Sequence, residues 1–258
     1  GGKSRAVKHI LPHFPEDVTE VCSPFLGGGS VELALAEKGV WVYGYDTFEP
    51  LIWFWRALLG NPDALANEAD SLRKYKDYYY GYRGLPKEDF NLIKEELRNE
   101  EKYSLQNAAK FYALNRSSFS GATLSGGWSK RASYERFTDS SITRVREFSQ
   151  PKLYVAAQHF KHSIPAHPKT FLYLDPPYLL GKDRENLYGD AGNKHKGFDH
   201  AGLVNILKER DNWILSYNNC PEILKLYEGY DIIYPDWKYG MSSDKTSKEV
   251  LIINKEKQ

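Results

Sequence analysis

Residues 18–46 decide the fold; they read VTEVCSPFLGGGSVELALAEKGVWVYGYD. Val18–Ser23 is a short apolar run typical of a strand, and the three glycines that follow it allow a tight turn. Ser30–Lys38 has apolar residues at helical spacing, and Val40–Tyr45 is a second strand pattern that ends at Asp46. Strand, helix and strand in this order predict a βαβ unit, a parallel sheet and the α/β class.

The pattern turns helical after this unit and returns to α/β later in the chain. Helices are predicted at Leu51–Leu59, Pro62–Tyr80, Pro86–Asn99 and Leu105–Leu114. Strands are predicted at Leu153–Ala157, Thr170–Leu174, Trp213–Ser216, Tyr230–Tyr234 and Glu249–Ile253, with helices at Ala201–Arg210 and Pro221–Tyr227. We therefore predict one catalytic domain of residues 1–50 and 151–258, interrupted by a mainly helical insert of residues 51–150.

The composition excludes several classes of protein. A chain of 258 residues with 41% hydrophobic residues and a net charge of +1 supports a packed core without a polybasic tail. No apolar run is long enough to span a membrane, and the N-terminus has no secretion signal. The two cysteines exclude a disulfide scaffold and a cysteine-based zinc site. We expect an intracellular protein without a membrane partner or a bound metal, and further residues upstream of Gly1, because no initiator Met is present.

The glycine loop has the composition of a cofactor site. In Phe25-Leu26-Gly27-Gly28-Gly29-Ser30, the glycines let a ligand approach the backbone closely. Asp46 follows Gly29 by 17 residues, at a strand end where a carboxylate can accept hydrogen bonds from both hydroxyls of a ribose. The spacing favours a nucleotide-type cofactor; the alternative is a plain turn in which Ser30 caps the helix.

A second motif, Asp175-Pro176-Pro177-Tyr178, directly follows the apolar run Phe171–Leu174. The prolines fix φ and donate no hydrogen bonds, so the carbonyls of this turn can point into a site. The Asp175 carboxylate and the Pro176 carbonyl can accept both N–H bonds of an amino group on a heteroaromatic ring, and Tyr178 can stack on that ring. Such contacts make the amino nitrogen a nucleophile; the alternative is an ordinary turn after a strand.

Taken in order, Gly1-Gly2-Lys3, the glycine loop, Asp46 and the Asp-Pro-Pro-Tyr turn resemble the Dam-type (D12 class) DNA adenine-N6 methyltransferases over essentially the whole chain. The resemblance implies a Rossmann-like methyltransferase sheet with a mainly helical target-recognition insert. It implies methyl transfer from S-adenosylmethionine to N6 of a flipped-out adenine in double-stranded DNA. It further implies a monomer or weak dimer in a prokaryotic cytoplasm or a virus-infected host cell.

The resemblance also assigns roles to individual residues. The cofactor residues that it implies are Gly2, Lys3, Phe25, Gly27, Gly29, Asp46 and Phe160. Lys3 would pair with the methionine carboxylate and Asp46 with the ribose, while the turn from Asp175 to Tyr178 would hold the target adenine. Ala157-Gln158-His159-Phe160 departs from the family pattern, in which an acidic residue followed by an aromatic contacts the cofactor's adenine.

The insert supplies the DNA-facing candidates. Leu114-Asn115-Arg116 with Phe119-Ser120-Gly121 resembles the start of the family's recognition hairpin, and six basic residues against three acidic ones lie between Tyr112 and Gln150. The predicted DNA-binding residues are Arg116, Phe119, Ser120, Lys130 and Arg131. Phe119 is predicted to wedge into the base stack; the alternative is that it packs beneath the insert. A second basic and aromatic stretch, Arg73–Tyr80, is either another patch or a solvated helix face.

Other activities stay open at this stage. The nearest alternatives are methylation of adenine N6 in RNA or of cytosine N4 in DNA, although an aspartate before Pro-Pro-Tyr favours adenine. A catalytically inactive DNA-binding homologue is the alternative from another class, and the intact Asp175 and Tyr178 argue against it. The target sequence, and a restriction-linked or independent role, are left open.

Overall fold

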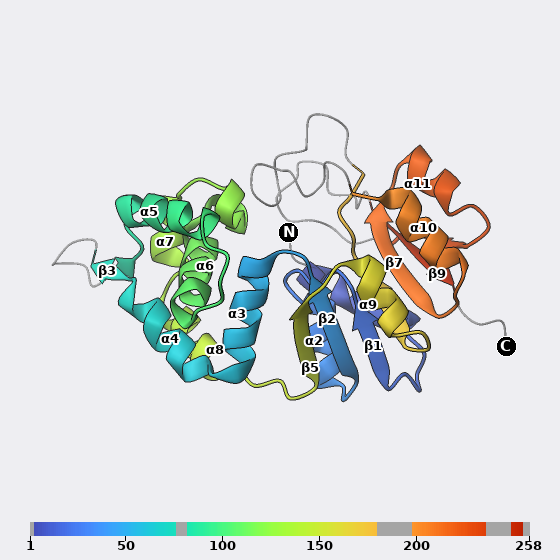
Figure 1. The fold of residues 1–258 in the computed structure, drawn as a ribbon, viewed down its shortest axis with the longest axis horizontal. Helices are drawn as coiled ribbons and strands as arrows, with labels where there is room; N and C mark the ends of the chain where they lie inside the picture. Colours follow the sequence, from blue (N-terminus) through green and yellow to red (C-terminus); the bar gives the residue numbers. More distant parts are fainter. Residues whose placement is uncertain (1–2, 76–81, 180–197, 236–248, 255–258) are drawn as a thin grey trace. The chain divides into compact units, whose positions relative to one another are not determined.

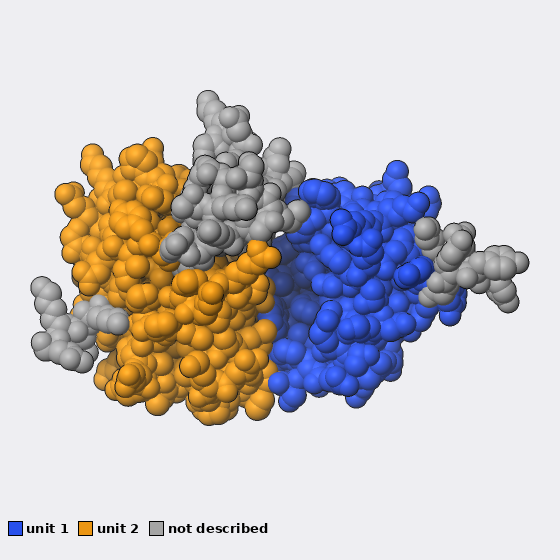
Figure 2. Space-filling view, turned by 180° about the vertical axis from the view of Figure 1, so that it is seen from behind, with its two compact units in different colours: residues 1, 48–149, 180–197 blue, residues 2–47, 150–179, 198–258 orange. Residues whose placement is uncertain are grey.

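The structure is a computed structural model that describes residues 3–75, 82–179, 198–235 and 249–254 (Figure 1). The chain forms two compact units, coloured separately in Figure 2. One, here called the helical unit, contains residues 48–149. The other, the sheet unit, contains residues 2–47, 150–179 and 198–258. None of the helices in the described ranges is long and apolar enough to cross a membrane.

The sheet unit is built on a seven-stranded sheet in the order β5-β2-β1-β6-β7-β9-β8. The strands are β1 Glu20–Ser23, β2 Trp41–Asp46, β5 Leu153–Ala157, β6 Phe171–Leu174, β7 Trp213–Asn218, β8 Asp231–Ile233 and β9 Glu249–Asn254. Neighbouring strands run parallel except β9, which is antiparallel to both β7 and β8. The predicted α/β class with a largely parallel, Rossmann-like sheet is confirmed.

Helices cover both faces of this sheet. They are η1 Lys3–Arg5, α1 Val7–Ile10, η2 Leu11–His13, α2 Ser30–Glu37, α9 Phe160–Ala166, α10 His200–Lys208 and α11 Pro221–Leu226. Leu172 and Leu174 of β6 lie in the core cluster that contains residues of α9, α10 and α11. Successive strand side chains point to opposite faces, and Phe171 accordingly contacts Phe14, which follows η2. Burial on both faces explains why β6 is a continuous apolar run.

The order of the strands places a ligand site. From β1 the chain adds β2 and β5 on one side, whereas β6 and β7 lie on the other side. The β1–β6 boundary is therefore the switch point of the sheet, with Cys22 paired to Leu172. In open α/β sheets, ligands bind outside the carboxyl ends of the strands at this point. The glycine loop follows β1 and the Asp-Pro-Pro-Tyr turn follows β6, so both motifs lie at this edge.

The helical unit packs its other helices around α6. Its elements are α3 Glu49–Gly60, α4 Pro62–Ser71, β3 Lys74–Tyr75, β4 Arg83–Gly84, α5 Lys87–Arg98, α6 Leu105–Ser117, η3 Phe119–Gly121, η4 Thr123–Ser125, α7 Lys130–Glu135 and α8 Asp139–Arg146. Helix α6 contacts α3, α4, α5 and α7, and most of its side chains are buried.

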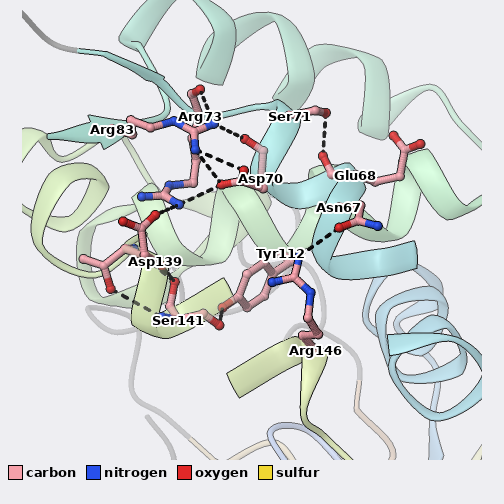
Figure 3. A network of polar contacts seen from close by, with 11 residues as sticks. Asn67, Glu68, Asp70, Ser71, Arg73, Arg83, Tyr112, Asp139, Ser141 and Arg146 are labelled. Atoms are coloured by element: carbon pink, nitrogen blue, oxygen red, sulfur yellow. Dashed lines mark hydrogen bonds and ion pairs between the residues drawn. The ribbon is translucent and has the colours of Figure 1, made fainter. Parts of the chain in front are cut away.

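The predicted helix over Pro62–Tyr80 is wrong for residues 72–75, because α4 ends at Ser71 and the buried Arg73 redirects the chain (Figure 3). The Arg73 guanidinium donates to Asp70 at 2.8 Å and to Asp139 at 2.6 Å. Arg83 on β4 also donates to both carboxylate oxygens of Asp70, at 3.1 and 3.0 Å. Arg73 is thus neither on a solvated face nor in a basic patch, and residues 76–80 of that predicted stretch lie outside the described residues.

Candidate active site

The glycine loop turns sharply at the end of β1. Gly27 and Gly29 have φ of +49° and +65°, the left-handed region that glycine enters without steric cost. The Gly27 N–H donates to the Asp46 carboxylate at 3.1 Å, which joins the loop to the end of β2. A Cβ built on Gly27 or Gly28 would meet nothing within 4 Å, so the loop faces open space. Loop and carboxylate together form a backbone cradle with room for a ligand.

An aromatic cluster lies beside the loop. Phe25 lies 5.7 Å from Phe160 and 5.6 Å from Phe198 between ring centroids, and Phe160 lies 5.4 Å from Phe198. Phe160 begins α9, where the His159 side chain caps the helix by accepting the Lys161 N–H at 3.3 Å. The predicted cofactor residues Phe25 and Phe160 are thus in contact, and Phe198 is a partner that the sequence did not indicate.

The Asp-Pro-Pro-Tyr turn is held by the end of β7. The Tyr217 hydroxyl donates to the Pro177 carbonyl at 3.3 Å. The Asn218 amide brackets Leu179, donating to its carbonyl at 2.8 Å and accepting from its N–H at 3.1 Å. The Tyr178 ring stacks on Tyr217 with centroids 5.9 Å apart. These contacts fix the turn from the neighbouring strand.

A buried charge cluster joins the N-terminus to this turn. The Lys3 ammonium donates to Glu249 at 2.7 Å and lies 3.4 Å from the Asp175 carboxylate. It also hydrogen-bonds the Tyr178 hydroxyl, which in turn donates to the other Glu249 oxygen at 2.6 Å. Lys3 is 7% exposed and Glu249 is 9% exposed. The resemblance implies that Lys3 binds the cofactor; among the described residues, its ammonium contacts Glu249 and the Asp-Pro-Pro-Tyr turn.

Burial sets the protonation of two carboxyl groups at this edge. Desolvation raises the pKa of Asp175, which the Lys3 charge opposes and the Glu249 charge reinforces. Glu32, in the first turn of α2, has its pKa raised to about 7, first by burial and further by the charge of Asp175. Glu32 accepts a hydrogen bond from the Ser23 hydroxyl at 2.6 Å. Across the described ranges, no group of three His, Cys, Asp or Glu side chains is placed to hold a metal ion.

The predicted DNA-facing residues lie on the helical unit. Phe119 is 66% exposed in a loop of two short 3-10 turns, closed by a bridge between Ser118 and Trp128 rather than by a regular hairpin. The neighbouring Ser120 is also exposed, and its φ is +53°. Exposure of Phe119 contradicts the alternative that it packs beneath the insert.

The basic residues of this surface differ in their contacts. Lys130 and Arg131 are exposed at the start of α7, and Arg131 pairs with Glu135 at 2.7 Å. Arg116 is half-buried and donates to the Arg136 carbonyl through two nitrogens, at 3.0 and 2.6 Å. Arg116 therefore braces the chain that carries the loop.

The structure brings together the predicted residues of the sheet unit, while Gly2 lies outside the described residues. It adds Glu249, Glu32 and Asn218, to which the sequence assigned no role, and it brings Phe198 beside Phe25 of the glycine loop. Glu32 stands out in the sequence as an acid among apolar helix positions, and Asn218 closely follows the predicted strand Trp213–Ser216, at a strand end where ligand sites lie. No local sequence pattern indicates a site role for Glu249, because only the antiparallel pairing of β9 with β7 brings it to this edge of the sheet.

Comparison with known proteins identifies a family and a relative of this chain. The family model for D12 class N6 adenine-specific DNA methyltransferases matches residues 1–241. A Type II methyltransferase of Lactococcus lactis subsp. cremoris, M1.LlaDCHI, is 22% identical over 276 residues, covering 98% of this chain and 93% of the relative.

Proposed function

The chain belongs to the D12 class N6 adenine-specific DNA methyltransferases, and from this we propose S-adenosylmethionine as its methyl donor and the carboxyl edge of the sheet unit as the place of transfer. The enzyme methylates the N6 amino group of adenine in DNA. The observation that carries the assignment of the site is the meeting of Lys3, Asp175 and Tyr178 at the switch point of the sheet.

The residues at the glycine loop fit the proposed cofactor. S-adenosylmethionine, when bound, supplies a methyl group on a positively charged sulfur. Gly27 and Gly28 leave open space at the backbone, where a side chain would stand in the way of a ligand. Asp46 is the acceptor proposed for the ribose hydroxyls, and Phe25 with Phe160 forms an apolar surface beside the loop.

The catalytic step that we assign to this chain acts on the adenine amino group. The base must leave the duplex to reach the turn, because N6 is inaccessible within the stack. The Asp175 carboxylate and the Pro176 carbonyl accept its two N–H bonds, and Tyr178 stacks on the ring. Asp175 then takes the proton that N6 loses, which the raised pKa of its carboxyl group favours.

Double-stranded DNA is the proposed substrate, with the surface around Phe119 as part of its interface. Lys130 and Arg131 are the exposed cations proposed to contact phosphates. The surface ion pair between Arg131 and Glu135 hinders a phosphate contact of Arg131 only slightly, because exposed ion pairs contribute only about 0–1 kcal/mol. We assign Ser120 a contact beside Phe119 at the exposed end of the loop.

Transfer of labelled methyl from S-adenosylmethionine to duplex DNA, followed by nucleoside analysis, tests this function. Asp175→Ala should lower turnover by about a hundredfold or more, because the amino group loses an acceptor. Asp231→Ala, at an exposed position of the same unit, is the matched control. Calorimetry should show nearly unchanged cofactor affinity in Asp175→Ala. Turnover near wild type in that variant would remove Asp175 from the site.

A further inference from the structure

Glu249 is a buried carboxylate at the active edge to which the proposed reaction gives no role. It is the first residue of β9, and it lies opposite Asn218 in the antiparallel pairing with β7. The end of β7 and the beginning of β9 therefore meet at the same edge of the sheet. Asn218 holds the turn through Leu179, and Glu249 reaches the same turn through Tyr178.

We propose that Glu249 is a positioning residue for methyl transfer, which fixes the Tyr178 phenol with one carboxylate oxygen and the Lys3 ammonium with the other. The inference rests on the proposed roles of Asp175 and Tyr178. Both of its contacts are short, at 2.6 Å from the Tyr178 hydroxyl and 2.7 Å from the Lys3 nitrogen, and the side chains of Glu249 and Lys3 are buried. Hydrogen bonds to an ionised, buried acceptor are the stronger kind, and so they lock the ring of Tyr178 in one orientation.

The second consequence is electrostatic. Lys3 lies closer to Glu249, at 2.7 Å, than to Asp175, at 3.4 Å. The lysine ammonium therefore interacts more strongly with Glu249 than with Asp175. Asp175 stays available to accept hydrogen bonds from the amino protons of adenine. Without Glu249, the ammonium would pair with Asp175 alone and compete with the substrate for that carboxylate.

Among the described residues, the charged and titratable groups that act on Asp175 come from several elements. They are Lys3 from η1, Glu249 from β9, Tyr178 from the same turn and Glu32 from α2. Among them, Lys3 favours the ionised form of Asp175 and the Glu249 charge opposes it. Removing the negative charge of Glu249 therefore lowers the pKa of Asp175, whereas a contact that only braced the fold would not change it.

The test is Glu249→Gln, with turnover measured against pH at saturating cofactor and duplex DNA. We expect turnover to fall roughly tenfold, less than for loss of a direct contact. The acidic limb of the pH profile should move to lower pH. Glu249→Asp, which keeps the charge, should return the limb toward its wild-type position. Glu228→Gln is the exposed control in the same unit.

A double-mutant cycle separates positioning from general weakening. Tyr178→Phe keeps the ring and removes the hydroxyl, so its effect on turnover should be non-additive with that of Glu249→Gln. An unmoved acidic limb, or a loss of turnover matched only by a lower melting temperature, would overturn the role of Glu249. Full activity of Asp175→Ala would instead overturn the proposed function. An inactive Asp175→Ala beside a Glu249→Gln with wild-type turnover and limb would overturn only the inference on Glu249.

Discussion

The Ser23 hydroxyl donates a 2.6 Å hydrogen bond to Glu32, joining the end of β1 to the first turn of α2. Glu32 is 3% exposed, and its burial is the main cause of a pKa raised to about 7. The carboxyl group is therefore largely protonated in the folded protein at pH values where it is ionised in the unfolded chain. Folding is then coupled to proton uptake at Glu32.

Glu32→Gln should make stability less dependent on pH. Because the folded pKa is raised, the native state holds the extra proton, and stability falls as pH rises from about 4.5 to about 7. Loss of this proton lowers the free energy of unfolding by an amount on the order of 3 kcal/mol. A glutamine at position 32 is neutral at every pH and does not undergo this loss. Urea unfolding at pH 5 and pH 8 measures the difference, with exposed Glu37→Gln as the control on the same helix. Equal pH dependence in wild type and Glu32→Gln would contradict this account.

Asp46→Ala should weaken binding of S-adenosylmethionine. The substitution removes the proposed ribose acceptor and the 3.1 Å contact that anchors the Gly27 N–H. Loss of hydrogen bonds to a charged acceptor costs about 1–3 kcal/mol, which is roughly 5-fold to 150-fold in affinity. Titration calorimetry checks it, with exposed Asp17→Ala of the same unit as the comparison. Unchanged affinity would remove Asp46 from the cofactor site.

Two aspartates that share Arg73 should differ in their effect on stability. Asp70→Asn takes an anion from the buried Arg73 and also from Arg83, and should cost about 3 kcal/mol of unfolding free energy. Asp139→Asn removes a partner whose side chain is 86% exposed, and should cost about 1 kcal/mol or less. Chemical denaturation of both variants gives the comparison. Equal losses would show that neither the exposure of the aspartate nor its second partner Arg83 sets the cost.

The strands of the sheet unit and the two chemical motifs were predictable from sequence, because each depends on local pattern; the two-residue strands β3 and β4 were not predicted. The apolar run before Asp175 and the glycines after β1 follow directly from period and turn chemistry. The end of α4 was not predictable from local pattern. The chain leaves the helix just before Arg73, whose guanidinium hydrogen-bonds Asp139, a residue far along the sequence. Helices α7, α8 and α9 were also missed: α7 and α8 are mostly polar and show little apolar period, and α9 contains Pro165.

The same distinction applies to the site. The spacing between Gly29 and Asp46 can be read within one βαβ unit, and the structure joins Gly27 to Asp46. Glu249 lies 246 residues from Lys3, and its position follows only from the pairing of β9 with β7. An acid at the start of a predicted strand has no local signal for a role in catalysis.

Phe119→Ala should impair extrusion of the target base while leaving the protein stable. The side chain is 66% exposed, so its removal creates no cavity and should change the unfolding free energy by about 0.5 kcal/mol or less. Its loop is nonetheless ordered: the Phe119 N–H donates to the Gly127 carbonyl at 3.0 Å, and the Arg136 side chain donates to the Asn115 carbonyl at 2.6 Å. An exposed ring on a braced loop suits an apolar wedge that lowers the cost of unstacking.

The measurement pairs 2-aminopurine fluorescence at the target position with the melting temperature. Phe119→Ala should lower the fluorescence gain on binding, with turnover falling in parallel. Lys130→Ala should instead weaken binding to all DNA sequences and reduce the salt dependence of affinity, because it removes a phosphate contact. Exposed Leu92→Ala on α5 controls for loss of apolar surface from the same unit. A normal fluorescence gain in Phe119→Ala would show that extrusion of the base does not need the Phe119 ring. This result would exclude the wedge.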